Sequence, residues 1–277
     1  MKKIVLVSLL SLVSLGLVAC GNSTAKPSSE SSATPENKVV KIAAHLPTMV
    51  DIIKVATPVM EEAGYTLELV QVNDNIQYNE LLKNEEVDAN FAQHQPFMET
   101  FNQERDANLV AVQKIYDAKV GFYSKNAKTI DEIPDGSKVA IPSDVSNEGR
   151  ALAILDNAGL ITLDKGVGFE GTTKDIVENP HNFQWLSVDL LNLSETYDEK
   201  DVSLVYNYPA YIAKIDLTPD DALILEEKID QRFSISLVAR EDNQDSPEIT
   251  ALKKAMTSPE VKKFLEEEHG NTIVPSF

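Results

Sequence analysis

Residues that could hold a small polar molecule gather at four places, each at or just after the end of a predicted strand. Ligands of open α/β sheets bind beyond the carboxyl ends of strands, where loops and helix N-termini meet. Amide side chains and one histidine at these strand ends therefore predict a binding cleft rather than a catalytic centre. The four places are Asn73–Asn75 after TLELVQV (66–72), Gln93-His94-Gln95 after VDANFA (87–92), Ser143–Asn147 after KVAI (138–141), and Asn207 at the end of VSLVYN (202–207).

Arg150 is the cation best placed to hold an anionic group in such a cleft. It lies one turn into a helix predicted over 148–159, which follows the capping residues of PSDVSN (142–147). A planar guanidinium can grip a carboxylate with two hydrogen bonds, and the helix N-terminus adds positive potential. From the residues alone the alternative stays open that Arg150 pairs on the surface with Asp144, Glu148 or Asp156.

The sequence offers no signature of catalysis. GxSxG, Walker-type, GxGxxG and HExxH patterns are absent, and the 44 acidic residues are too many for any pair to be a signal. A metal site needs two to four converging ligands, and only His45 and His94 lie near strand ends. We therefore predict a protein that is not an enzyme, with no catalytic residue, no metal site and no cofactor.

The first residues, MKKIVLVSLLSLVSLGLVAC, have the basic start, apolar run and small-residue end of a secretory signal. The ending LVAC followed by Gly21 is typical of a bacterial lipobox, which predicts a signal peptide over 1–19 and lipidation of Cys20. Residues 20–38 are rich in Ser, Thr, Pro and Asn, and we interpret them as a flexible tether. These features predict a lipid-anchored protein on the extracytoplasmic face of the cell membrane; an ordinary secreted protein is the alternative.

The formal net charge of −19 makes nucleic acid an unsuitable partner, because a strongly acidic chain repels phosphates. Cys20 is the sole cysteine, so the folded part has neither disulfides nor thiol chemistry. About 240 residues follow the tether, enough for one large domain or two smaller ones.

Strands and helices alternate along this folded part, which predicts an α/β fold with a largely parallel sheet. TTKDIVENP (172–180) is interpreted as a short helix, and two Ser-Pro starts predict helices at 246–256 and 258–270. The predicted strands are 38–45, 66–72, the segment into 92, 109–115, 119–124, 138–141, 183–188, 202–207, 222–228 and 234–240.

Four segments together resemble the NlpA/MetQ family of lipoproteins, the substrate-binding components of methionine-type ABC importers. They are EVDANFAQHQPF (86–97), the long run from Phe122 to Leu163, DIVENPHNF (175–183) and SLVYN (203–207). The resemblance implies a two-lobed, type II periplasmic-binding-protein fold, each lobe a mixed sheet flanked by helices. It places lobe one at 39–122 and 208–277 and lobe two at 123–207.

The same resemblance implies roles for individual residues. His94 matches a histidine that touches the ligand from lobe one, and Arg150 matches the arginine that holds the ligand carboxylate. Asn147 would shape the same loop, and Asn207 would hydrogen-bond the amino-acid head. Implied partners are a small-molecule ligand, an ABC permease and its ATPase, and the membrane through the lipid anchor.

Three positions depart from the family in the pocket for the ligand side chain. Ala92 replaces an aromatic residue before the QH pair, Asn75 replaces a tyrosine, and Phe97 replaces another tyrosine. Methionine or a related amino acid is the expected ligand. The altered pocket leaves a different amino acid or a short peptide as alternatives, and a surface adhesin or interaction lipoprotein is a further one.

Overall fold

The computed structural model describes residues 38–226 and 228–277. The predicted signal peptide, the lipidation site Cys20 and all but the last residue of the predicted tether lie outside the described residues. The larger strands of the described chain form two separate sheets of six and five strands.

The first sheet has the order β13-β4-β12-β3-β1-β2. Its middle strands β1 and β3 run parallel, as do β1 and β2, whereas β12 is antiparallel to both β3 and β4. This sheet is mixed, so the largely parallel arrangement expected from strand-helix alternation is wrong for β4, β12 and β13, whose pairings are all antiparallel. The strands are β1 (Lys38–Ala44), β2 (Tyr65–Gln71), β3 (Ala89–His94), β4 (Leu109–Ala118), β12 (Ile235–Arg240) and β13 (Ile273–Pro275).

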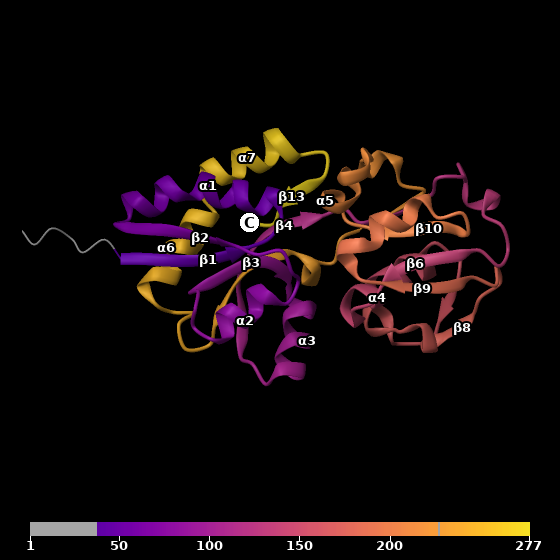
Figure 1. The fold of residues 1–277 in the computed structure, drawn as a ribbon, viewed down its shortest axis with the longest axis horizontal. Coiled ribbons are helices and arrows are strands. Elements are labelled where there is room, and N and C mark those ends of the chain that lie inside the picture. The colour runs from indigo at the N-terminus through magenta and orange to yellow at the C-terminus, as the bar shows by residue number, and fades with distance from the viewer. Residues whose placement is uncertain (1–37, 227) are drawn as a thin grey trace, which may run out of the picture. The chain divides into compact units, whose positions relative to one another are not determined.

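Helices cover the first sheet on both sides (Figure 1). Helices α1 (Pro47–Glu62), α6 (Pro247–Met256) and α7 (Pro259–His269) pack together, and α2 (Gln77–Lys83) and α3 (Gln95–Arg105) lie against β3 from the other side. The two Ser-Pro starts are confirmed, because Ser246 and Ser258 accept N-terminal N–H groups of α6 and α7.

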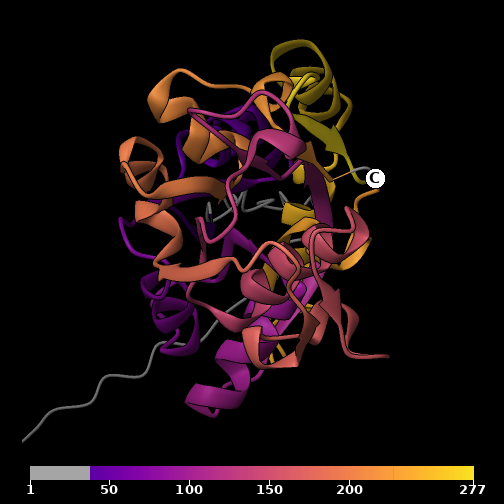
Figure 2. The same ribbon diagram turned by 90° about the vertical axis from the view of Figure 1, so that its right-hand side faces the viewer.

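The second sheet has the order β11-β5-β10-β6-β9 and faces the viewer in Figure 2, pink to orange. Strand β6 is parallel to β9 and β10, and β5 is antiparallel to β10 and β11. Helix α4 packs on β6. The elements are β5 (Gly121–Tyr123), β6 (Lys138–Pro142), α4 (Val145–Asn157), β9 (Gln184–Val188), the 3-10 helix η4 (Leu190–Asp198), β10 (Val202–Asn207), α5 (Pro209–Ile212) and β11 (Ile224–Leu225).

The short helix predicted over 172–180 is wrong. Thr172 begins a single 3-10 turn, Thr173–Asp175, closed by a reciprocal capping box with Asp175. The chain then forms β8 (Ile176–Glu178), which pairs with β7 (Thr162–Leu163). The β-branched pair Ile176-Val177 suits an extended edge better than a helix.

The chain passes between the two sheets twice, after β4 and after β11. The passages lie side by side, since Leu223 N–H donates to Phe122 O at 2.8 Å and Glu226 N–H donates to Val120 O at 2.9 Å. A Cβ on Gly121 would lie 2.6 Å from Ile224 O, so only glycine permits this approach. Because β11 belongs to the second sheet, that sheet extends past residue 207, where the return to lobe one was expected.

Candidate ligand-binding site

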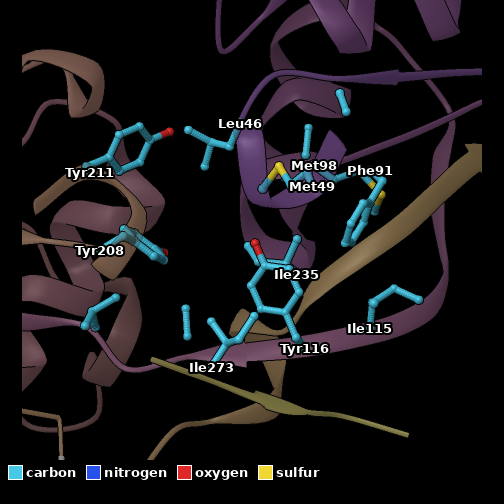
Figure 3. Packing of buried hydrophobic residues seen from close by; sticks show 14 of the residues in the cluster. Leu46, Met49, Phe91, Met98, Ile115, Tyr116, Tyr208, Tyr211, Ile235 and Ile273 are labelled. Carbon is cyan, nitrogen blue, oxygen red and sulfur yellow. The ribbon is translucent and has the colours of Figure 1, made fainter. Parts of the chain in front are cut away.

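A cavity of about 240 Å³ is bordered by segments of both sheets. Figure 3 shows Tyr208 and Tyr211 on one side and Leu46, Tyr116 and Ile235 on the other. No Asp, Glu, Lys or Arg stands among the described residues that line it. The lining residues are His45, Leu46, Thr48, Met49, Asn75, Tyr78, Ala92, His94, Phe97, Tyr116, Ala118, Asn147, Leu190, Tyr208, Pro209, Ala210, Tyr211, Ala213, Ile235, His269, Thr272 and Ile273.

Strand β3 presents alternate residues to this cavity. Ala92 and His94 line it, whereas Gln93 points to the opposite face, where it exchanges hydrogen bonds with buried Asn79. His94 is the last residue of β3 and also caps helix α3, because its Nδ1 accepts the N–H of Phe97 at 3.2 Å. The structure therefore places His94 at the strand end, as the sequence predicts.

The hydrogen bonds of His94 define its tautomer. Since Nδ1 accepts from Phe97, the ring proton lies on Nε2, which donates to Asn147 Oδ1 at 3.1 Å. Burial, with the nearby charge of Arg150 second, lowers the pKa of His94 from 6.5 to about 3. His94 is therefore a neutral donor at physiological pH.

Asn147 connects the two sheets at this point. It lies in the first turn of α4, where its N–H and side-chain amide both donate to Asp144. Its Oδ1 accepts from His94 and also from the hydroxyl of Tyr208 at 2.8 Å. Both lone pairs of that oxygen are in use, so a ligand that needs it must displace one of these partners.

Arg150 is fully buried and lies behind the cavity wall rather than on it. Its Nε and Nη2 donate to the two carboxylate oxygens of Glu226 at 3.1 and 2.5 Å, and its Nη1 donates to Tyr208 Oη at 3.0 Å. The alternative of a surface pair with an acidic neighbour in α4 is therefore wrong. The guanidinium does hold a carboxylate with two hydrogen bonds, but that carboxylate is the side chain of Glu226 in the same chain.

The other predicted site residues divide into two groups. Asn75, Ala92 and Phe97 line the cavity. Asn207 is buried but does not line it: its Oδ1 accepts the N–H of Tyr208, and its Nδ2 has no partner among the described residues.

Sequence reasoning considered His45 only as a possible metal ligand and missed the polar group that it forms on the cavity wall. His45 Nε2 lies 3.0 Å from Tyr211 Oη, and its ring stacks on Tyr78 with centroids 5.6 Å apart. Its buried Nδ1 has no partner among the described residues, and burial lowers its pKa to about 4. Two signals were available: His45 ends the first strand, and YPAY follows Asn207 at the end of another.

Within 38–226 and 228–277, no three His, Asp or Glu side chains are grouped so that they could hold a metal ion. No helix of the same residues has the length and apolar character needed to cross a membrane.

Residues 40–277 match the family model described as NlpA lipoprotein. The chain belongs to the NlpA lipoprotein family. It is 33% identical to the methionine-binding lipoprotein MetQ of Bacillus subtilis, over 99% of each chain. Among solved structures it is similar to a YaeC-family lipoprotein from Enterococcus faecalis (46% identity, 87% of this chain and 100% of that one, TM-score 0.79). It is also similar to a nutrient binding protein from Burkholderia cenocepacia bound to methionine (31% identity, 86% and 100% covered, TM-score 0.80).

These similarities bear on four predictions for this NlpA-family protein. The resemblance to the family is confirmed, as is the α/β fold of the substrate-binding class, since the structural matches cover nearly all described residues. The role is substrate binding rather than catalysis, because the relatives are named as binding proteins. As a lipoprotein family member, the chain is an extracytoplasmic, membrane-associated protein.

Proposed function

We propose that this protein captures an amino acid, methionine or a relative of it, in the cavity between its two sheets and delivers it to an ABC permease with its ATPase. The observation that carries the proposal is the His94–Asn147 hydrogen bond, which joins the end of β3 to the start of α4 across the wall of the cavity. A ligand in contact with both residues would touch both sheets. In the proposal, Cys20 carries the lipid that holds the receptor near its permease.

The lining of the cavity supports an amino acid with an apolar side chain. Most of its residues are apolar or aromatic, and burial of an apolar chain contributes about 25 cal/mol per Å² removed from water. The polar groups on the wall include the neutral His94, Asn147, Asn75 and the tyrosine hydroxyls. A few such groups fix the orientation of a small ligand. Ala92 leaves more room than an aromatic residue would, so a different amino acid or a short peptide remains the alternative ligand.

Ligand binding would act on the contacts between the sheets. A ligand shifts a conformational equilibrium only by its difference in affinity for the two states. A molecule held by groups from β3 and α4 together gains its full set of contacts only when these elements are close. Capture would therefore favour the closed arrangement, which is the form that a permease could recognise.

The test is calorimetric titration of protein that has been unfolded and refolded to remove any retained ligand. Each proteinogenic L-amino acid, D-methionine and a set of dipeptides would be titrated in turn. We expect one apolar amino acid to bind with micromolar or tighter affinity, and His94→Ala to weaken that binding at least about tenfold, the scale of one lost buried hydrogen bond.

His181→Ala is the matched control, because His181 pairs with Asp135 and lies outside the cavity wall. Its affinity should equal that of the unchanged protein. The proposal would be contradicted if no amino acid or dipeptide bound and native mass spectrometry also showed no retained small molecule.

A further inference from the structure

The guanidinium of Arg150 is held by a segment that links the two sheets. Glu226 directly follows β11, in the second passage between the sheets, and its carboxylate accepts from Arg150 Nε and Nη2. The first passage also takes part, because Ala118 O accepts from Nη2 at 3.3 Å. Arg150 thus joins helix α4 to both passages through hydrogen bonds.

Only one layer of residues separates Arg150 from the cavity. Ala118 and Tyr208 both line the cavity, and each accepts a hydrogen bond from Arg150. The ring of Tyr208 also lies 5.4 Å from the guanidinium carbon. A carboxylate in the cavity would reach Arg150 if the Tyr208 side chain turned aside, and no Asp, Glu, Lys or Arg is among the described residues that line the cavity.

Glu226 has a second place available to it. It lines another cavity, of about 480 Å³, together with the exposed Lys228 and with Asp230. A carboxylate released from Arg150 could therefore turn towards water and an ammonium group. This matters because a carboxylate left buried without a partner would be strongly unfavourable.

We propose that Glu226 is an affinity-determining residue that occupies the place of the ligand's carboxylate on Arg150 while the cavity is empty. The inference rests on the proposed function, since it requires a ligand with a free carboxylate. Binding is then an exchange of one carboxylate for another, so Arg150 never loses its ion pair. The exchange also releases the second passage from α4, which couples ligand capture to the segments that join the sheets.

The test compares L-methionine with L-methioninamide, which has no carboxylate, in the unchanged protein and in Glu226→Gln. The neutral amide of Gln competes poorly for a guanidinium, so methionine should bind about tenfold tighter or more, the scale of one charge-assisted hydrogen bond. Methioninamide should bind equally to both proteins. Glu260→Gln, on the exposed face of α7, removes the same charge elsewhere and should leave both affinities unchanged.

A second measurement needs no amino acid. Glu226→Ala leaves a space the size of a carboxylate beside Arg150, and sodium acetate should raise the melting temperature of this variant more than that of the unchanged protein. Sodium chloride at the same ionic strength is the control. If acetate stabilises Glu226→Ala but no amino acid binds to the unchanged protein, the proposed function is overturned. The exchange of carboxylates at Arg150 is then still supported.

Two results would overturn the exchange itself. One is the absence of any acetate effect in folded Glu226→Ala. The other is equal binding of methionine and methioninamide by the unchanged protein, which would show that no ligand carboxylate reaches Arg150. Should Glu226→Gln fail to fold, the methionine and methioninamide comparison in the unchanged protein still decides the matter.

Discussion

Two polar clusters border the cavity, and they differ in how fully their hydrogen bonds are satisfied. The arginine cluster consists of Arg150, Glu226, Tyr208, Asn147 and His94, and its hydrogen bonds form one continuous chain. The histidine cluster consists of His45, Tyr78 and Tyr211, and it has one direct hydrogen bond, between His45 and Tyr211.

This difference separates groups that stabilise the fold from a group that can still take a new hydrogen-bond partner. Buried polar groups that satisfy one another rigidify a structure, whereas an unpaired buried group costs about 1–3 kcal/mol until something binds it. The arginine cluster is therefore expected to contribute more to the stability of the fold. The histidine cluster, with the unpartnered Nδ1 of His45, is the more open to a new partner.

The largest expected effect comes from removal of the cation in the arginine cluster. Arg150→Met removes the partner of the Glu226 carboxylate, and breaking a buried ion pair costs about 3–5 kcal/mol where the remaining charge stays buried. Because Glu226 can turn towards the second cavity, we expect a loss at the lower end of this range. Urea unfolding should show this loss in the free energy of unfolding.

The double variant Arg150→Met/Glu226→Leu is the control for this prediction. Because it removes both charges, it should recover most of the lost free energy. A single variant as stable as the unchanged protein would contradict the role given to the arginine cluster.

The next effect is a dependence of stability on pH. The pKa of His94 is about 3 in the folded protein and ordinarily 6.5, so below pH 6.5 the unfolded chain takes up a proton that the folded chain refuses. Stability is therefore lost as pH falls from about 6.5 towards 3, and His94 accounts for about 1.4 kcal/mol at pH 5.5 relative to neutral pH. His45, whose pKa burial lowers to about 4, should add a loss of the same sign and of similar size at pH 5.5.

Urea unfolding at pH 7.5 and at pH 5.5 checks this, with His94→Gln as the comparison. The variant has no imidazole at this position, so its stability should change less between the two pH values. Equal pH dependence in both proteins would show that His94 does not carry the effect.

The smallest expected effect is the difference in stability between two tyrosine variants, one from each cluster. Tyr208→Phe leaves Arg150 Nη1 without its acceptor and removes a donor to Asn147, which should cost about 1–3 kcal/mol. Tyr211→Phe removes one hydrogen bond to a half-buried histidine and should cost about 0.5–1.5 kcal/mol. Thermal unfolding of the two variants ranks them, and the reverse order would contradict the comparison of the clusters.

The local elements of the fold could be predicted because their signals lie within a few residues. Pro96 in the first turn of α3 and the Ser-Pro starts of α6 and α7 mark helices by chain geometry alone. The sheet to which β11 belongs could not be predicted from such local signals. Ile224-Leu225 is an apolar pair that suits either sheet, and only its pairing with Phe122 and Gly121 assigns it to the second.

Part of the binding site could also be predicted, because its signals lie within a few residues of the predicted strand ends. His94 and Asn147 follow strand ends and carry polar side chains, so the rule for α/β sheets locates them. The partner of Arg150 was beyond reach, because Glu226 lies 76 residues away and is one of 44 acidic residues. No local pattern selects one carboxylate among so many, since the selection is made by the packing of both passages against α4.

The close approach at Gly121 has a mechanical consequence. Because the two passages are hydrogen-bonded to each other through Val120 and Phe122, they form a ribbon of two strands rather than two independent tethers. A side chain at position 121 would push the two strands of this ribbon apart, because its Cβ would lie 2.6 Å from Ile224 O.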